Sequence, residues 1–290
     1  MGRAWYPLAG HYQRLNKYKE LFVTGVMLSN ASIDVAFHDK RLFYNDYSNY
    51  IKKYWVGLMD GNGSIQVNHW RSKNLQYRLI IKLSNNISNI NMLNLIKNII
   101  GGNVKIIDNK FVIWVVNNKK DIINIIDIFN EYPLLTINKQ AQLNFLKKNI
   151  EYNDINWYFN NRNLKYDKND YYLNNIKNIL FNIKKNNNYS FFNPWLSGFI
   201  EAEGCFSIRK NNSQSFSIGQ NDNYYLLNFI KDHFNINNKI RLIKNKNNNF
   251  YLLEVYKKTV LLDIINHCNY NQLLGYKYIS FEKFNKNLNK

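Results

Sequence analysis

The sequence predicts an α+β protein in which one α-β-β-α-β-β-α unit occurs twice. Three observations support this: a recurring segment, a switch between helical and strand periodicity inside each copy, and a basic composition rich in aromatic residues. The chain has 290 residues, a formal net charge of +19, 46% hydrophobic residues and 16% aromatic residues. That length allows one large domain or two smaller ones. The aromatic content excludes a disordered basic tail.

The recurrence involves three segments that keep their order and near-constant spacing. WVGLMDGNGSIQV (residues 55–67) recurs as WLSGFIEAEGCFSI (195–208), and VVNNKKDIINII (115–126) matches VYKKTVLLDIIN (255–266). YPLLTINK (132–139) matches NQLLGYK (271–277). A conserved order of three matches indicates a tandem duplication. Trp55 and Trp195 are predicted as equivalent core positions, and residues 149–193 are predicted as a linker with a little helix.

Within each copy the periodicity predicts the elements. The first copy begins with an apolar helix that ends between Asp60 and Gly63. Its further elements are expected as strands at 64–68 and 76–83, a helix at 90–100, strands at 103–107 and 110–116, and helices at 120–130 and 139–149. In the second copy, strands are expected at 205–209, 215–220, 239–243 and 250–256.

The alternation of apolar and polar residues within the strands predicts that one face of each sheet is exposed to solvent. Tyr77, Leu79, Ile81 and Leu83 point to one side of their strand, and Ile208 is predicted to face inward between Ser207 and Arg209. A sheet with a basic, amide-rich face and helices behind it can lie against a nucleic acid, because such side chains match phosphates and base edges. The predicted contacts are Gln66, Arg71, Lys73, Gln76, Arg78, Lys82, Ser207, Arg209, Lys210, Arg241, Lys244 and Lys246, with Trp70 beside them.

The two copied helix ends resemble the LAGLIDADG motif of homing endonucleases and of related splicing maturases, over about residues 47–283. The resemblance implies a monomer with pseudo-twofold symmetry and saddle-shaped antiparallel sheets, in which the two motif helices pack side by side. The sixth-position acids, Asp60 and Glu201, belong to the helix end and the interface in this family. Small residues would permit the close approach of the helices: Gly57, Gly61, Ser197, Gly198 and Ala202.

The same resemblance implies a metal-dependent site for phosphodiester hydrolysis, with Mg²⁺ or another divalent cation. Its eighth-position ligands are Glu203 in the second motif and Asn62 in the first, where a neutral amide offers no charge. The family's polar residue after the second strand corresponds to Gln220 in the second copy and to Asn85 in the first. Its basic residue corresponds to Lys277, with Asn138 at that point of the first copy and Lys139 next to it.

The implied function is site-specific cleavage of double-stranded DNA at a long asymmetric site, the intronless exon junction, with a degenerate first half-site. No small-molecule substrate is expected. The alternative is an RNA maturase that assists splicing of its own group I intron with weak or no DNA cleavage. A third interpretation, a basic membrane- or ribosome-associated structural protein, depends only on charge and on the mildly apolar residues 21–37.

The N-terminal residues FVTGVMLSNASIDVAFHD (22–39) resemble a stretch of the largest subunit of cytochrome c oxidase. This implies a reading frame that runs from an oxidase exon into a group I intron, and therefore a location in the mitochondrial matrix. The predicted division is an exon-derived tail at 1–46, a first unit at 47–150, a linker at 151–190 and a second unit at 191–290. Cys205 and Cys268 cannot form a disulfide framework and are predicted as core residues.

Overall fold

The computed structural model describes residues 33–210, 212–244 and 249–288. The chain divides into two compact units, Met1–Tyr47 and Ser48–Lys290, and the second contains every strand described below. Most of the oxidase-like segment and Lys246 lie outside the described residues, and the predicted division at 46, 150 and 190 stays a prediction. Among the described residues, no helix combines the length and apolar character needed to cross a membrane.

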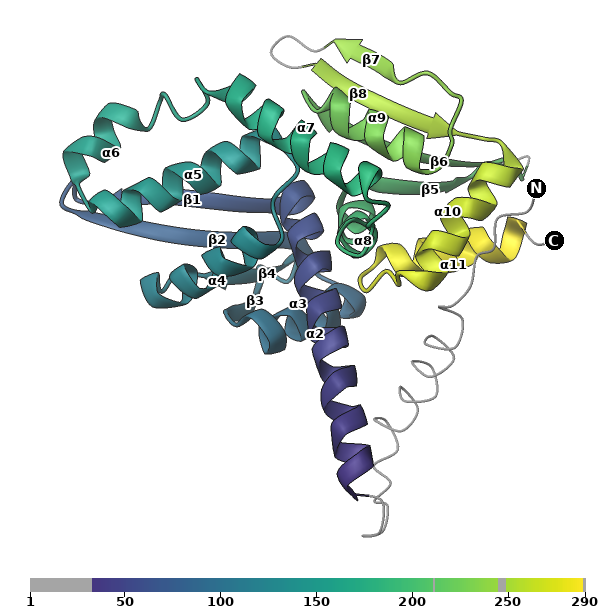
Figure 1. The fold of residues 1–290 in the computed structure, drawn as a ribbon, viewed down its shortest axis with the longest axis horizontal. Coiled ribbons are helices and arrows are strands. Elements are labelled where there is room, and N and C mark those ends of the chain that lie inside the picture. Colours follow the sequence, from purple (N-terminus) through teal and green to yellow (C-terminus); the bar gives the residue numbers. More distant parts are fainter. Residues whose placement is uncertain (1–32, 211, 245–248, 289–290) are drawn as a thin grey trace. The chain divides into compact units, whose positions relative to one another are not determined.

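Each copy of the repeat forms the predicted series of elements and closes with two helices (Figure 1). The first contains α2 (Ile33–Asn62), β1 (Gly63–Trp70), β2 (Asn74–Ser84), α3 (Ile87–Ile100), β3 (Asn103–Ile107), β4 (Phe111–Val116), α4 (Lys119–Glu131) and α5 (Ile137–Tyr152). The second contains α8 (Phe192–Glu203), β5 (Gly204–Ile208), β6 (Gln214–Asn221), α9 (Tyr224–His233), β7 (Arg241–Lys244), β8 (Asn249–Val255), α10 (Lys258–Tyr270) and α11 (Lys277–Leu288). We call residues 48–152 the first half and 192–288 the second half.

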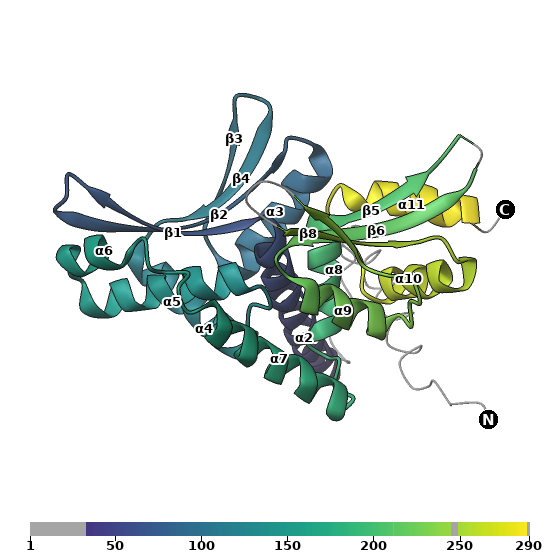
Figure 2. The same cartoon turned by 90° about the horizontal axis from the view of Figure 1, so that it is seen from above.

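Each half contains one four-stranded antiparallel sheet, with strand order β1-β2-β4-β3 in the first and β5-β6-β8-β7 in the second. Helices α4 and α5 lie on one side of the first sheet and α9 and α10 on one side of the second, leaving the other sides uncovered (Figure 2). Tyr77, Leu79 and Ile81 are buried toward the helices. The α+β prediction with two equivalent antiparallel sheets is therefore confirmed.

The segment between the two halves is more helical than predicted. It contains α6 (Ile155–Asn161) and α7 (Asn169–Lys185). In α7 the buried residues are Tyr172, Ile176, Leu180 and Ile183, a spacing that places them on one face of a helix. Their apolar stripe drives the helix to pack although asparagine and lysine dominate the composition around it.

Two inward positions of the sequence prediction need correction. Ile208 lies on the same side of β5 as the buried Phe206, but at the end of the strand, where it remains 42% exposed. Cys268 is buried as predicted, whereas Cys205 is exposed on the uncovered side of β5. The core below this strand is filled instead by an aromatic cluster of Phe206, Phe216, Phe281 and Phe284.

Each motif helix passes into the first strand of its sheet without a loop. Helix α2 ends at Asn62 and β1 begins at Gly63, while α8 ends at Glu203 and β5 begins at Gly204. A Cβ on Gly204 would lie 2.8 Å from the carbonyl oxygen of Ile200, so this sharp transition requires glycine. The last helical residue of each motif is thereby fixed at the edge of its sheet.

Candidate active site and nucleic-acid interface

Helices α2 and α8 approach each other through a pair of glycines. A Cβ on Gly57 would overlap the carbonyl oxygen of Trp195, and a Cβ on Gly198 would overlap the carbonyl oxygen of Tyr54. Because the obstacle is backbone in both cases, no rotamer change could make room for a side chain. The reciprocal contacts also show that Tyr54 is the counterpart of Trp195. The predicted equivalence of Trp55 and Trp195 is wrong, although both indoles are fully buried.

The ends of the two motif helices also meet. A Cβ on Gly61 would overlap that of Ala202 and would lie 3.2 Å from Oε1 of Glu203. The residue after Gly61 is Asn62, which is exposed. The two eighth-position residues therefore end helices that touch at their last turn.

The sixth-position acids lie behind these ends and are buried. Asp60 accepts hydrogen bonds from Trp195 Nε1 of the other half (2.8 Å), from the Leu135 amide (2.7 Å), and from the Thr136 amide (3.0 Å) and hydroxyl (2.6 Å). Burial raises the pKa of Asp60 to about 6, although these hydrogen bonds act to lower it. With its oxygens occupied by these hydrogen bonds, Asp60 holds the helices and the loop together.

Glu201, the equivalent acid of the second half, is held by the same kinds of contact, and here the first half supplies the aromatic donor. It accepts hydrogen bonds from Tyr54 Oη (3.1 Å), from the Gly275 amide (3.1 Å) and from the Lys277 amide (2.8 Å). Burial raises its pKa, and the hydrogen bonds oppose this shift. Each half thus anchors the acid of the other half through one aromatic side chain, Trp195 or Tyr54.

Two asparagines also form hydrogen bonds between the halves, and the sequence did not single them out. Asn223 Oδ1 accepts the Ile137 amide (3.3 Å), and Asn89 Oδ1 accepts the Tyr276 amide (3.0 Å). Each asparagine holds the start of the last helix of the other half. Both follow the second strand of their sheet but at different positions, since Asn89 lies in the first turn of α3 and Asn223 is the residue before α9. Asparagine is so abundant here that single occurrences carry little signal.

A cavity of about 220 Å³ opens where the two helix ends meet. Glu203 and Gln220 of the second half and Asn138 and Lys139 of the first half line it. Lys139 also donates a hydrogen bond to the Gly63 carbonyl. Burial raises the pKa of Glu203, while the charges of Lys139 and then Lys277 lower it. The cavity therefore combines the Glu203 carboxylate with the Lys139 ammonium group in a partly desolvated space, and the hydrogen-bonded Asp60 forms part of its wall.

This composition changes the predicted site. Gln220 and Glu203 share the cavity, but the lysine beside them is Lys139 of the first half. Lys277 is near enough to act on the charge of Glu203 but does not line the cavity. The sequence prediction chose Lys277 because it lies in the same repeat as Glu203. Alignment of the two copies does not show which side chains of the two halves come together in one site.

The uncovered sides of the sheets carry most of the predicted nucleic-acid contacts. In the first sheet, alternation places Gln66, Gln76, Arg78 and Lys82 on the uncovered side. The residues of the β1–β2 turn, Arg71 and Lys73, are exposed, and the Arg71 guanidinium lies 5.3 Å from the Trp70 ring centre.

In the second sheet, Ser207 and Arg209 follow Cys205 along the uncovered side, and Arg241 faces the same way from β7. Lys210 is exposed in the β5–β6 turn. Lys244 is exposed, but alternation from Arg241 places it on the opposite side of β7. It is thus separated from the other predicted contacts of this sheet.

The LAGLIDADG endonuclease family model matches residues 55–150 and 196–288, which together make up more than half of the chain. The chain belongs to the LAGLIDADG endonuclease family. Its two motifs are the helix ends that meet at the cavity.

Relatives of similar sequence have corresponding names. A Dictyostelium citrinum protein named "Probable intron-encoded endonuclease aI3" is 46% identical over 81% of this chain and 93% of its own length. A Debaryomyces hansenii protein of the same name is 44% identical over 91% of this chain, which spans only 48% of that relative. Among solved structures, the LAGLIDADG homing endonuclease I-GzeII in complex with its DNA target is 25% identical, with a TM-score of 0.58 over 81% of this chain and 88% of that one.

The sheet register identifies a further departure in the first LAGLIDADG half. Gly63 pairs with Ile81 in β2, and Gly204 pairs with Ile218 in β6. Counting two residues onward, the counterpart of Gln220 is Leu83, not Asn85. The Asn85 amide nitrogen donates to the Asn109 carbonyl (2.9 Å) in the β3–β4 turn. The first half therefore has Asn62 and Leu83 where the second has Glu203 and Gln220.

The side chains at the LAGLIDADG cavity suit a hard divalent cation whose remaining ligands come from water and phosphate oxygens. Among the described residues, no group of three or more His, Cys, Asp and Glu gathers around a common point. The cavity offers the Glu203 carboxylate and the amide groups of Gln220, Asn138 and Asn221. Mg²⁺ is commonly bound through one or two carboxylates with water and phosphate oxygens as its other ligands. Glu203 suits that role, whereas neutral Asn62 is a weaker ligand.

Proposed function

We propose that this chain is an intron-homing DNA endonuclease that hydrolyses phosphodiester bonds of double-stranded DNA, with its principal site at Glu203. The observation that carries the proposal is the meeting of Glu203, Gln220 and Lys139 in one cavity at the junction of the motif helices. The uncovered basic sheet faces and the net charge of +19 suit a long duplex. The names of the relatives agree with this activity.

In this proposal each side chain at the cavity has a distinct task. Glu203 would hold a divalent cation, and Asn62, which ends the adjoining motif helix but is not among the residues that line the cavity, would be a weaker ligand. When bound, a divalent cation would stabilise negative charge at the phosphate and make a water molecule more acidic. Gln220 orients the attacking water through its amide. Lys139 places a positive charge beside the phosphate, and its partial burial makes that charge less screened by solvent.

The two halves should act unequally on the two DNA strands. The half-site opposite Glu203 offers Asn62 without charge and Leu83 without a polar group. Its basic residue is Lys277. We expect this side to bind a cation more weakly and to cut its strand more slowly, so nicked duplex should accumulate before double-strand breaks.

The proposed setting follows from the N-terminal resemblance. An oxidase exon that continues into the reading frame implies expression from a group I intron and location in the mitochondrial matrix. The natural target is then the exon junction that lacks the intron, a long asymmetric site for a pseudo-twofold monomer.

Incubation of the full chain with Mg²⁺ and a labelled duplex of the intronless oxidase junction tests the proposal. We expect a nick on one strand first, and a loss of at least about a hundredfold in rate in Glu203→Gln, because a metal ligand is worth several kcal/mol. Asp232→Asn also removes one negative charge, but on helix α9. It serves as the control and should cut normally. Absence of any nick or break at every enzyme excess would refute the proposal.

A second function, assistance of group I intron splicing, is favoured by Asn62 and Leu83, since an RNA-binding role needs no second metal ligand. Splicing of the intron RNA should then be faster with the protein and should not change in Glu203→Gln. Equal splicing rates with and without the protein would remove this role.

A further inference from the structure

Glu254 is the only acidic side chain in the eight strands that the structure describes. It alternates with buried Leu253 and Val255 and therefore points to the uncovered side of the second sheet. A carboxylate on a face that meets DNA repels phosphates, so its presence needs a local reason. That reason lies in two arginines that share it.

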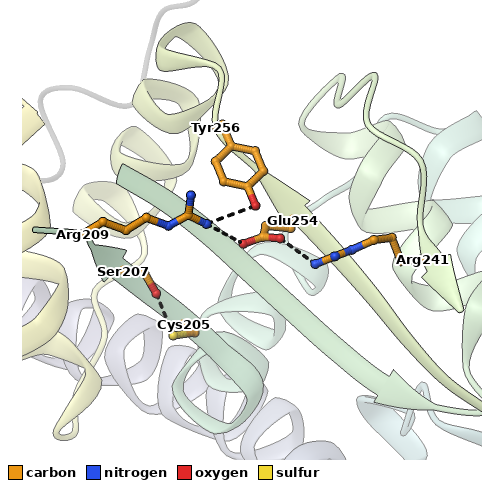
Figure 3. A network of polar contacts seen from close by, with 6 residues as sticks. All are labelled: Cys205, Ser207, Arg209, Arg241, Glu254 and Tyr256. Atoms are coloured by element: carbon orange, nitrogen blue, oxygen red, sulfur yellow. Dashed lines mark hydrogen bonds and ion pairs between the residues drawn. The ribbon is translucent and has the colours of Figure 1, made fainter. Parts of the chain in front are cut away.

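Each carboxylate oxygen of Glu254 faces one guanidinium (Figure 3). Oε2 lies 2.6 Å from Nη2 of Arg241, and Oε1 lies 3.6 Å from Nη2 of Arg209. The side chain of Glu254 is only 18% exposed, whereas those of Arg209 and Arg241 are 53% and 60% exposed. The acid thus lies below the two bases, which present their outer edges to solvent.

Arg209 follows β5, on the far side of β6 from Glu254. The residues that β6 presents on the uncovered side at this level are Ser215 and Ser217, whose small side chains leave room above the strand. Arg209 also donates to Tyr256 Oη at 3.3 Å, and its guanidinium lies 5.1 Å from the centre of that ring. Arg209 is therefore held from two sides, by a carboxylate and by an aromatic ring.

Such a pair is better suited to base recognition than to neutralising phosphates. Exposed ion pairs contribute little to stability, and an acid between two arginines reduces their attraction for the DNA backbone. Each guanidinium uses Nη2 for Glu254 and keeps further N–H donors at its outer edge. Guanine offers two acceptors, O6 and N7, in the major groove, and a forked guanidinium matches them with two parallel hydrogen bonds.

We propose that Arg209 and Arg241 each recognise one guanine of the DNA target, and that Glu254 is a positioning residue that fixes both guanidiniums for this readout. The inference rests on the proposed function, since it requires the uncovered face of the second sheet to meet duplex DNA.

The test is selection of binding sites from a randomised duplex library by the full chain and by its variants. Arg209→Lys and Arg241→Lys keep the positive charge but lose the forked guanidinium. Each variant should lower the guanine preference at one base pair by about tenfold or more, and the base pair should differ between the two variants. Glu254→Gln should lower the preference at both positions by roughly threefold or more, while binding to unrelated duplex becomes tighter because a negative charge is lost. Asp232→Asn removes the same charge from helix α9, on the covered side of the sheet, and breaks the exposed pair with Lys184; it is the matched control and should change neither quantity.

The outcomes separate the inference from the function beneath it. A wild type that enriches a site while both lysine variants keep every guanine preference overturns the inference and leaves the proposed function intact. Unchanged preferences in Glu254→Gln alone overturn the positioning role. A wild type that enriches no duplex at all overturns the proposed function and this inference with it.

Discussion

The indole Nε1 of Trp195 donates a 2.8 Å hydrogen bond to Oδ2 of Asp60 and so ties helix α8 of the second half to the last turn of α2 in the first. Tyr54 makes the reciprocal bond to Glu201 at 3.1 Å. These two bonds join the halves directly behind the cavity that contains Glu203. The packing of the interface and the geometry of the candidate site are therefore coupled.

Loss of the Trp195 donor should destabilise the protein. Trp195→Phe removes the N–H and leaves one oxygen of a buried carboxylate with one partner fewer, so we expect a loss of about 1–3 kcal/mol in the free energy of unfolding, with an added packing cost. Denaturant unfolding measures it. Tyr54→Phe removes the bond to Glu201 and also the acceptor of the Leu274 amide (3.2 Å), so it should destabilise the protein as well. Equal stability of Trp195→Phe and wild type would contradict the anchoring role.

Burial of Asp60 predicts a specific pH dependence of stability. Its folded pKa of about 6 lies above the ordinary value of 3.8, so between these pH values the folded chain binds more protons than the unfolded chain. Stability from this group is full below pH 3.8 and is lost as the pH rises through 6. The unfolding free energy of wild type relative to Asp60→Asn should therefore fall by roughly 1–3 kcal/mol between about pH 4 and pH 7. A constant difference across this range would show that the Asp60 pKa is not raised.

The glycine contacts predict intolerance of any side chain between the motif helices. Gly198→Ala would drive a methyl group into the Tyr54 carbonyl, and separation of the helices should cost at least about 1–3 kcal/mol. Thermal unfolding of this variant beside Asn62→Ala, at an exposed helix end, provides the comparison. Similar melting temperatures for both variants would show that the helices can separate without loss.

The cavity predicts that Lys139 matters more than Lys277 for the strand cut at Glu203. Lys139→Met should slow that cut by about a hundredfold, the usual effect of removing one group that stabilises developing charge. Lys277→Met should slow the same cut much less, because Lys277 does not line the cavity. Strand-resolved cleavage of an end-labelled duplex distinguishes the two, and a reversed order would favour the assignment from the sequence.

Restoring an acid in the first motif should restore activity on the second strand. Asn62→Asp adds a carboxylate at an exposed helix end, where its cost in stability is small, and should raise the cleavage rate and the share of double-strand breaks. Time courses of nicked and linear plasmid report both quantities. Because Leu83 remains, we expect partial recovery only, and Asn62→Asp combined with Leu83→Gln should recover more. An unchanged or lower rate in Asn62→Asp would mean that the first-motif site has been misassigned.

The sequence could predict the elements better than their partners. The duplicated motif, the alternation in residues 76–83 and the small residues Gly57 and Gly198 are local patterns, and the structure contains the elements they indicate. Leu83 as the counterpart of Gln220 required the register of β1 and β2. Asn89 and Asn223 required knowledge of what crosses the interface, because their amides act on helices in the other half.

The sequence alone determined that the chain contains two related units with glycine-bearing helices, and that each unit buries an apolar face and leaves a basic face in water. These features follow from periodicity and composition, which act over a few residues at a time. Only the tertiary structure decided that Lys139, and not Lys277, shares a cavity with Glu203, and that Glu254 lies between Arg209 and Arg241. Both arrangements join side chains from separate strands or halves. Their distances depend on strand order and helix crossing, which are set by packing of the whole unit.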